Sequence, residues 1–210
     1  MNSSKSTILD IKGLGIRRSE RWLFQQLSTE ILPGQAVQVT GKNGAGKTSL
    51  LRALCGLLPY QEGDVMWQKV DDLPLIPTYI GHLPAVKAEL TVLENIQYHP
   101  INGQFYDEQS IEKVVVEAGL GAHLDHMTKH LSAGQVRRVA LARLLLSDAK
   151  CWILDEPFTA LDMNACAWLE SLISNYVAQG GTVILTSHQA VDLDVPIKEI
   201  PLQADMSDYV

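Results

Sequence analysis

The sequence has few cysteines, no long apolar run and no excess of basic residues. Its three cysteines, Cys55, Cys151 and Cys166, show neither CxxC nor Cys/His spacing, which argues against a disulfide scaffold or a zinc site. Cys55 and Cys151 lie in apolar runs. We therefore expect buried, reduced thiols of the kind found in a reducing compartment.

Segments that would enter or cross a membrane are also lacking. The first twelve residues are polar and contain no apolar h-region, so we expect no secretory signal. The longest apolar stretches, near residues 139–146 and 151–154, are far shorter than the roughly 20 residues that span a bilayer. We expect no transmembrane segment, so a chain of this kind serves a membrane only by docking on another protein.

Acidic residues outnumber basic ones, with 24 Asp and Glu against 17 Lys and Arg and a net charge of −7. This balance argues against a nucleic-acid partner, because phosphate binding needs a basic face. The 210 residues are 46% hydrophobic, which suits one domain with its own core. We expect a single domain over residues 1–210.

Short apolar runs alternate with helical patterns through much of the sequence. Apolar runs of this length are typical of strands in a sheet that is covered on both faces. Strand and helix in alternation predict an α/β fold with a mainly parallel sheet. We expect strands at residues 36–40, 79–83, 151–155 and 182–186, and helices at residues 48–58, 135–147 and 163–179.

Two regions depart from this alternation. Near the N-terminus, apolar runs at residues 8–11 and 27–32 flank a polar turn at 17–21, which predicts an antiparallel β subdomain beside the main sheet. Prolines and short helical patterns predict a helical subdomain over roughly residues 84–147. The tail holds a strand-like apolar run between two prolines, and we expect it to pack on the domain.

The strongest motif is residues 41–48 (GKNGAGKT), which satisfies G-x-x-x-x-G-K-[ST] between an apolar strand and a helix. Its glycines let backbone N–H groups turn toward phosphate oxygens, and the helix that follows adds its positive dipole end. Lys47 is expected to reach the β- and γ-phosphates of ATP, and the Thr48 hydroxyl to bind Mg²⁺. The expected nucleotide contacts are Gly41, Asn43, Gly44, Ala45, Gly46, Lys47, Thr48 and Ser49.

Residues 151–157 (CWILDEP) join four apolar residues to two acids. A buried strand would bring Asp155 to the edge of the sheet, where its carboxylate can hold Mg²⁺. Glu156 would then lie beside the γ-phosphate and could polarise the attacking water. Taken alone, the pattern fits a strand with a solvated acidic end equally well. The presence of the phosphate-binding motif at residues 41–48, called the P-loop below, favours the catalytic interpretation.

Residues 131–135 (LSAGQ) place small residues before a helical pattern, which makes a second N-terminal anion site. Ser132, Gly134 and Gln135 are therefore candidates for contact with a γ-phosphate. A second phosphate site on one domain makes sense if it serves the ATP of another subunit. Ala133 is acceptable within this run if its φ is negative.

The LSAGQ run resembles the signature of the ABC ATPase family, which is commonly LSGGQ. Residues 159–162 (TALD) resemble the D-loop of that family, in which Asp162 is a candidate contact. His188, after the strand expected at 182–186, resembles the switch histidine, which can hydrogen-bond the γ-phosphate and hold the attacking water. The five motifs follow the order of the family between residues 8 and 188.

This resemblance implies an ATPase of the ABC type that binds ATP and Mg²⁺. It also implies a head-to-tail homodimer that works with integral membrane permease subunits. ATP would close the dimer only through a higher affinity for the closed state. Each of its two ATP sites would combine Lys47, Thr48, Asp155, Glu156 and His188 of one subunit with Ser132 and Gly134 of the other.

Two positions depart from the family pattern. His82 occupies the place of a glutamine that usually links Mg²⁺ to the membrane partner, and we interpret it as a substituted coupling residue. An imidazole there can donate or accept a hydrogen bond. No aromatic residue stands at the usual adenine-stacking position, where Arg18 falls. Arg18 or Trp22 is a candidate for the base, and contact by neither residue is an equal alternative.

A narrower resemblance is to the ATP-binding export proteins of cytochrome c biogenesis, the haem exporter ATPases. It rests on Gly81-His82 and on the runs at residues 90–96 (LTVLENI), 131–144, 152–162 (WILDEPFTALD) and 183–189. It implies a peripheral subunit on the cytoplasmic face of a bacterial inner membrane. The cargo stays open, because the machine either exports haem or releases a haem-loaded chaperone.

Other functions compete with this one. An ATPase of another small ABC efflux system would carry the same motifs. A soluble ABC ATPase acting on ribosomes or DNA usually has two cassettes or a long coiled-coil insertion, and this sequence has one cassette and no heptad run. A P-loop kinase lacks the LSAGQ-type motif. His123, His126 and His130 could share one helical face and suggest haem ligation, but the polar residues between them favour a solvated surface.

Overall fold

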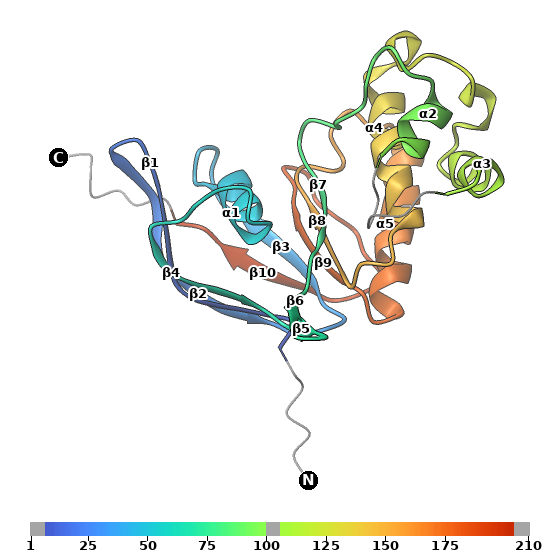
Figure 1. Cartoon of the computed structure of the whole chain (residues 1–210). Coiled ribbons are helices and arrows are strands. Elements are labelled where there is room, and N and C mark those ends of the chain that lie inside the picture. Colours follow the sequence, from blue (N-terminus) through green and yellow to red (C-terminus); the bar gives the residue numbers. More distant parts are fainter. Residues whose placement is uncertain (1–6, 100–105, 204–210) are drawn as a thin grey trace.

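The computed structural model describes residues 7–99 and 106–203 (Figure 1). A parallel sheet forms the centre, with strand order β10-β3-β9-β8-β7. β8 and β9 are buried along their whole length because both are apolar runs covered on two faces. The strands are β3 (Ala36–Thr40), β7 (Thr78–Ile80), β8 (Cys151–Leu154), β9 (Thr182–Thr186) and β10 (Ile197–Pro201).

All neighbours in this sheet run parallel, so their carboxyl ends meet at one edge. The P-loop follows β3, His82 follows β7, the two acids follow β8, and His188 follows β9. In open α/β sheets, ligands bind at this edge. The order of the strands therefore brings together motifs that lie far apart in the sequence.

A second, antiparallel sheet has the order β2-β1-β4. β1 (Leu9–Arg18) and β2 (Arg21–Ile31) form the hairpin expected near the N-terminus, and the turn passes through Ser19 at φ 55°. The third strand, β4 (Glu62–Trp67), pairs with the other edge of β1. A short hairpin follows, in which β5 (Lys69–Val70) and β6 (Leu73–Pro74) are joined by two residues at positive φ.

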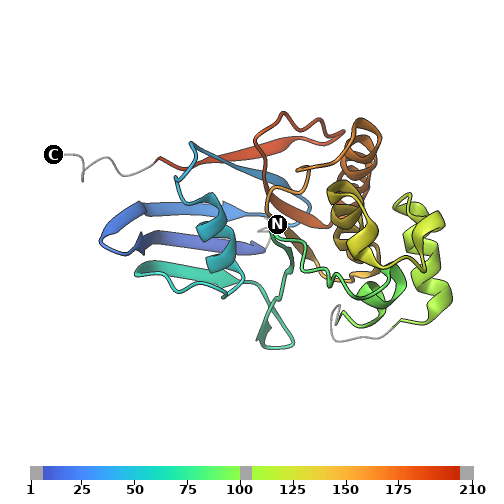
Figure 2. The ribbon, with the colours of Figure 1, turned by 90° about the horizontal axis from the view of Figure 1, so that it is seen from above.

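Helix α1 (Lys47–Leu54) lies between the two sheets, and its leucines share one apolar cluster with residues of β1, β3 and β8. Figure 2 shows α1 crossing the antiparallel strands, while the remaining helices gather at the other end of the molecule. Among these, α5 (Met163–Ala178) covers the parallel sheet through Leu169, Ile173 and Val177.

The helical lobe has its own apolar cluster, formed mainly by residues of three helices. α2 (Val92–Gln97) starts at a Thr91–Glu94 capping box, and α3 (Glu108–Glu117) is capped by Asp107. α4 (Ala133–Ala142) starts at Ser132. Three 3-10 turns complete the lobe: η1 (Gly121–His123), η2 (Thr128–His130) and η3 (Arg143–Leu146).

The mixed α/β architecture expected from the sequence is confirmed, with differences in detail. α1 ends at Leu54 rather than at 58, because Gly56 takes φ 69° just beyond the helix. The strand expected at 79–83 is the shorter β7, and the helix expected at 135–147 starts earlier and tightens into η3. The run between the tail prolines is the edge strand β10, whereas β4, β5 and β6 were not expected.

The three histidines His123, His126 and His130 do not share one helical face. His123 ends η1 and His130 ends η2, and His126 lies in the connection between them. The Nδ1 atoms of His123 and His126 lie 3.0 Å apart, on an exposed part of the lobe. The solvated surface interpretation therefore agrees with the structure.

All three cysteines are free thiols. Cys151 is fully buried and Cys55 is half-buried, and burial raises the pKa of Cys55 to about 12. Such thiols are unreactive at neutral pH, because the thiolate is the nucleophile. Within residues 7–99 and 106–203, no helix has the length and apolar character needed to cross a bilayer.

Gly63 provides a test of the close approach between β1 and β4. A Cβ at Gly63 would lie 2.3 Å from the Lys12 carbonyl oxygen, whereas a Cβ at Gly13 would meet nothing within 4 Å. Both glycines have positive φ, so Gly13→Ala is a matched control that costs about 1 kcal/mol. We expect Gly63→Ala to lower the free energy of unfolding by about 3 kcal/mol, measured by urea denaturation. Equal losses in the two variants would contradict this account.

Candidate nucleotide site

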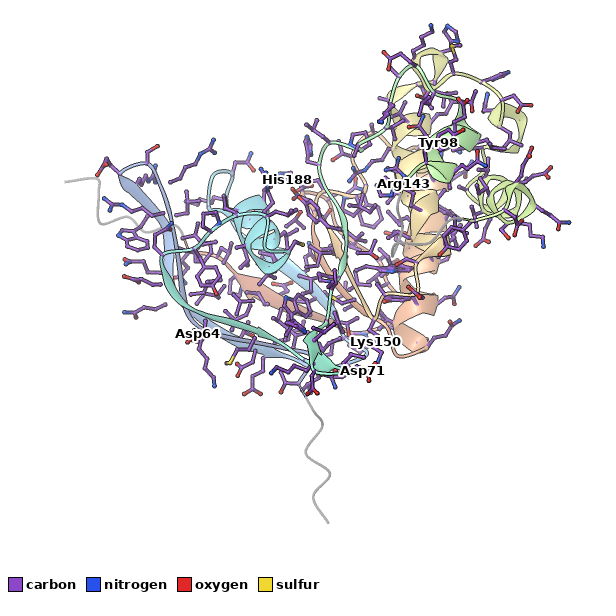
Figure 3. The ribbon with its side chains drawn as sticks, viewed as in Figure 1. Asp64, Asp71, Tyr98, Arg143, Lys150 and His188 are labelled. Carbon is purple, nitrogen blue, oxygen red and sulfur yellow. The ribbon has the colours of Figure 1, made fainter. Side chains whose placement is uncertain are left out.

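A cavity of about 560 Å³ opens at the carboxyl edge of the parallel sheet. His188 is one of the residues that line this cavity, and Figure 3 labels it on the side of the parallel sheet that faces the helical lobe. Residues from five separate segments of the sequence line it. They are Arg18, Leu23, Asn43, Gly44, Gly46, Lys47, Thr48, Ser49, His82, Glu156, Thr159 and His188.

The P-loop is shaped for an anion. Gly44 and Gly46 take φ 81° and 97°, in a region where glycine is favoured. Gly46 is the N-cap of α1 and offers no side chain to the first N–H groups, so these donors are free to meet a ligand. Lys47 is 9% exposed, and its Nζ donates to the carbonyl oxygens of Gly41 at 2.8 Å and Lys42 at 3.3 Å. Its ammonium thus ties the first residues of the loop to the start of α1.

Asp155 is 1% exposed and lies directly behind Thr48. Its Oδ1 accepts hydrogen bonds from Thr48 Oγ1 at 3.1 Å and from Thr186 Oγ1 at 2.9 Å. Its Oδ2 is buried and has no hydrogen-bond partner among the described residues. A buried carboxylate oxygen without a partner costs free energy, so this atom fits a bound cation or an ordered water.

The donor set at this point suits a hard divalent cation. A carboxylate and a hydroxyl are oxygen ligands, and Mg²⁺ typically takes one or two protein oxygens together with phosphates and water. In the described part of the chain, no group of three His, Cys, Asp or Glu side chains converges on one point. The residues present therefore fit Mg²⁺ that is shared with a nucleotide better than a cage made only by protein.

Glu156 is held in an unusual conformation, with φ 51°. Its N–H donates to Thr186 Oγ1 at 2.9 Å, so Thr186 contacts both acids. Glu156 Oε2 accepts a hydrogen bond from the main-chain N–H of His188 at 3.2 Å, and Glu156 Oε1 lies 3.3 Å from the ring Nε2 of His188. Its side chain is 13% exposed, and it lines the cavity together with that histidine. The acid expected to act as base is thus partly shielded from solvent and oriented by two neighbours.

The LSAGQ run caps α4. Ser132 Oγ accepts the Gln135 N–H at 3.3 Å, and Gln135 Oε1 accepts the Ser132 N–H at 2.8 Å, which together form a capping box. Ala133 is the first helical residue and is not among the residues with positive φ, as the sequence required. Gly134 is the strict position, because a Cβ there would lie 2.5 Å from the Ala160 carbonyl oxygen.

The structure does not bring the LSAGQ run to the P-loop of its own chain. Ser132, Gly134 and Gln135 are absent from the cavity lining described above, and so is Asp162. Asp162 instead caps α5, where its Oδ1 accepts the Ala165 N–H at 2.8 Å. These four expected nucleotide contacts thus lie outside the cavity of the same chain. Gly41 and Ala45 belong to the loop but do not line the cavity either.

Of the two candidates for the base, Arg18 lines the cavity and Trp22 does not. The Cζ atom of Arg17 lies 5.9 Å from the centroid of the Trp22 ring, and a Cβ at Gly15 would lie 3.1 Å from that ring. Leu23, which the sequence did not suggest, supplies an apolar surface beside Arg18. His82 lines the cavity as expected.

Two further residues that hold the site were missed from the sequence. Thr186 ends β9 and is fully buried, and a threonine at the end of a strand is too common to signal this role. Arg137 is 4% exposed and donates to the main chain of both acids. Burial lowers the pKa of its guanidinium, while the charges of Asp155 and Glu156 oppose that shift. An arginine on the buried face of an apolar helix was the available signal.

A family comparison agrees with this geometry. The ABC transporter family model matches residues 24–159, which include the P-loop, the LSAGQ run and the acidic motif. The chain belongs to the ABC transporter family.

Several curated relatives are similar to this ABC chain over most of its length. The cytochrome c biogenesis ATP-binding export protein CcmA of Vibrio cholerae is 42% identical over 196 residues, covering 90% of this chain and 95% of that protein. The proteins of the same name from Methylococcus capsulatus and Yersinia pestis are 43% and 44% identical. The match to the Methylococcus capsulatus protein covers 87% of this chain and 91% of that protein. The match to the Yersinia pestis protein covers 87% of this chain and 86% of that protein.

Solved structures share the fold of this ABC chain. An ATP-binding subunit of an ABC transporter superposes with a TM-score of 0.76 at 23% identity, covering 87% of this chain and 80% of that one. The ATP-binding cassette MJ0796, in a dimeric post-hydrolysis state bound to ADP and Pi, gives 0.72 at 21% identity, covering 86% and 88%. At this identity the likeness concerns the fold alone.

Lys47→Ala tests the nucleotide site. Removing the ammonium takes away the charge expected at the phosphates, so we expect ATP affinity to fall by at least about tenfold, as for loss of a charged hydrogen bond. Binding of a fluorescent ATP analogue would measure it. Lys150→Ala is the control, because Lys150 is exposed and lies outside the cavity (Figure 3). Unchanged affinity in Lys47→Ala would remove the assignment of this cavity to ATP.

His82→Gln tests whether His82 serves coupling or binding. His82 lines the cavity, but the main contacts of the P-loop do not depend on its side chain. We expect the variant to retain ATP affinity within about threefold, less than one ordinary hydrogen bond, in the same binding assay. A larger loss would place the His82 side chain on the nucleotide.

Proposed function

We propose that this chain is the ATP-hydrolysing subunit of an ABC membrane complex for cytochrome c maturation. In this role it couples hydrolysis to the export of haem or to the release of a haem-loaded chaperone. The observation that carries the proposal is the 42–44% identity, over almost nine-tenths of the chain, to proteins named cytochrome c biogenesis ATP-binding export protein. The cavity supplies the chemistry that such a subunit needs.

In the proposed complex with ATP, the phosphates occupy the P-loop. Lys47 turns from the loop carbonyls toward the β- and γ-phosphates, and the first N–H groups of α1 meet the phosphate oxygens. Arg18 and Leu23 flank the base. Thr48 and Asp155 hold Mg²⁺, with the unpartnered Oδ2 of Asp155 turned to the ion or to its water. The bound ion neutralises charge on the phosphates.

Glu156 acts as the general base in this proposal. Its carboxylate accepts the proton of the attacking water, and His188 hydrogen-bonds the γ-phosphate and helps to hold that water. Support comes from the contacts of the acid, because His188 and Thr186 both fix its position. A base that is oriented before ATP arrives needs little rearrangement in the transition state.

The proposed active form is a head-to-tail homodimer. The LSAGQ run lies outside the cavity of its own chain, yet it ends in a capped helix start of the kind that binds anions. A second copy can supply Ser132, Gly134 and Gln135 to the open face of the cavity. Each copy would then complete the site of the other, and ATP would favour the closed dimer through its contacts with both.

The membrane part of the machine is assigned to other chains. We infer a peripheral location on the cytoplasmic face of the bacterial inner membrane, where integral permease subunits would bind this ATPase. His82 supports a link to them, because it lies at the end of β7 and lines the nucleotide cavity. A change at the nucleotide can therefore reach the surface of the helical lobe through the segment that follows His82.

Glu156→Gln tests the enzyme and its biological role together. The amide cannot take a proton from water, so we expect ATP binding to persist while turnover falls by roughly 10² to 10⁴. The variant should accumulate as a dimer with ATP, detected by size-exclusion chromatography. Glu112→Gln is the control, because this exposed glutamate on α3 lies far from the cavity.

The cellular test uses a strain from which the chromosomal gene has been deleted. Haem staining of c-type cytochromes should be lost and should return with the wild type and Glu112→Gln, but not with Glu156→Gln. Normal staining in the deletion strain would overturn the role in cytochrome c maturation and leave an ABC ATPase of another system. Normal turnover of Glu156→Gln would overturn the assignment of Glu156 as the base.

A further inference from the structure

Arg137 is a buried guanidinium whose partners all belong to the main chain. Nη2 donates to the carbonyl oxygens of Asp155 and Glu156, each at 2.9 Å, and Nε donates to that of Pro157 at 3.2 Å. Nη1 donates to the carbonyl oxygens of Gly81 at 2.7 Å and His82 at 3.3 Å. In the described part of the chain, one side chain therefore binds five carbonyls on two loops of the nucleotide site.

This contact controls the direction of Glu156. A non-glycine residue in the left-handed region costs about 1–2 kcal/mol and persists only where its surroundings fix it. Arg137 holds the carbonyls of Asp155 and Glu156, on either side of the Glu156 Cα atom, and Thr186 holds the N–H between them. Both peptide planes are thus fixed, so the carboxylate points toward the cavity and His188.

Arg137 also joins this loop to α4. It lies in the second turn of the helix that starts at Ser132, and its fork spans from the residues after β7 to those after β8. A shift of α4 would therefore move Arg137 against the acidic loop and against the His82 main chain. A lysine could not replace it, because an ammonium lacks the planar fork that reaches two loops at once.

We propose that Arg137 is a positioning residue for ATP hydrolysis, which sets Glu156 and His82 according to the position of the helix that carries the LSAGQ run. The inference rests on the proposed function, because it requires Glu156 to be the base. In this proposal, the buried side chain of Arg137 links the LSAGQ run, which would contact a second copy, to Glu156, which would polarise the attacking water.

Arg143 provides a matched control, because it resembles Arg137 in residue type, burial and kind of hydrogen-bond partner. It is 2% exposed, follows directly after α4, and donates to three main-chain carbonyls, those of Pro84, Ala85 and Asn95. None of these three residues lines the nucleotide cavity. Arg143→Lys and Arg137→Lys therefore remove the same chemical group from similar surroundings. Only Arg137 contacts the acidic loop after β8, whereas Arg143 contacts the later part of the segment after β7.

The experiment compares both lysine variants of the full-length chain with the wild type. Thermal unfolding gives the loss of stability, an ATP-binding titration gives Kd, and steady-state hydrolysis gives kcat. We expect similar falls in melting temperature for the two variants. For Arg137→Lys, kcat should fall by about 10- to 100-fold, as for a misplaced catalytic group, with Kd for ATP within about threefold. For Arg143→Lys, both constants should stay within about twofold.

Arg137→Gln serves if the lysine variant does not fold, because its amide can still donate to two of the carbonyls. Equal changes in kcat for the position 137 and position 143 variants, at similar loss of stability, would overturn the proposal. A loss of ATP affinity that matches the loss of kcat would also overturn it, because Arg137 would then act on binding.

Glu156→Gln, assayed in parallel, separates this inference from the proposed function. If Glu156→Gln loses turnover while Arg137→Lys hydrolyses normally, only the role of Arg137 is wrong. If Glu156→Gln hydrolyses normally, the base itself is misassigned, and the premise on which the role of Arg137 rests is wrong too.

Discussion

The arrangement of the site depends on one buried carboxylate at the end of β8. Asp155 accepts hydrogen bonds from Thr48, which lies in the first turn of the helix after β3, and from Thr186, which ends β9. Three segments of the parallel sheet thus meet at a single oxygen atom. That sheet is close-packed on both faces, so the end of each strand has a fixed position. The first residues of the loops that follow the strands are therefore fixed as well. The second oxygen of Asp155 is left for a ligand.

The same sheet edge bears on the proposal that two copies of this ABC chain act together. The cavity is lined by residues of the P-loop, by Glu156 and by His188, while the LSAGQ run in the helical lobe does not line it. In the proposed dimer, a second copy would bring its LSAGQ run to this cavity. Arg137 connects the two regions, because it lies on the helix of the LSAGQ run and donates hydrogen bonds to main-chain carbonyls of the acidic loop and of the segment after β7.

Much of the architecture follows from local patterns. β3 and β9 lie where apolar runs predict them, because a fully buried strand needs an unbroken apolar sequence. The ends of α1 and α4 differ from expectation, because a positive-φ glycine and a 3-10 turn end them earlier than their apolar pattern does. β4 has mostly polar and exposed positions, and it forms because β1 offers a free edge. No periodicity of its own predicts it.

Residue types and their spacing are enough to identify the chemical groups of this protein: a phosphate loop, an Asp–Glu pair after a buried strand, a histidine after another, and a helix start of small residues. Local chemistry suffices there, because spacing along the chain sets the shape of each motif. Which of these groups meet depends on long-range packing. Arg18 faces the cavity rather than Trp22, and Thr186 and Arg137 hold Glu156. Hydrogen bonds to main-chain atoms distant in sequence leave no pattern of residue types, since any residue can offer a carbonyl.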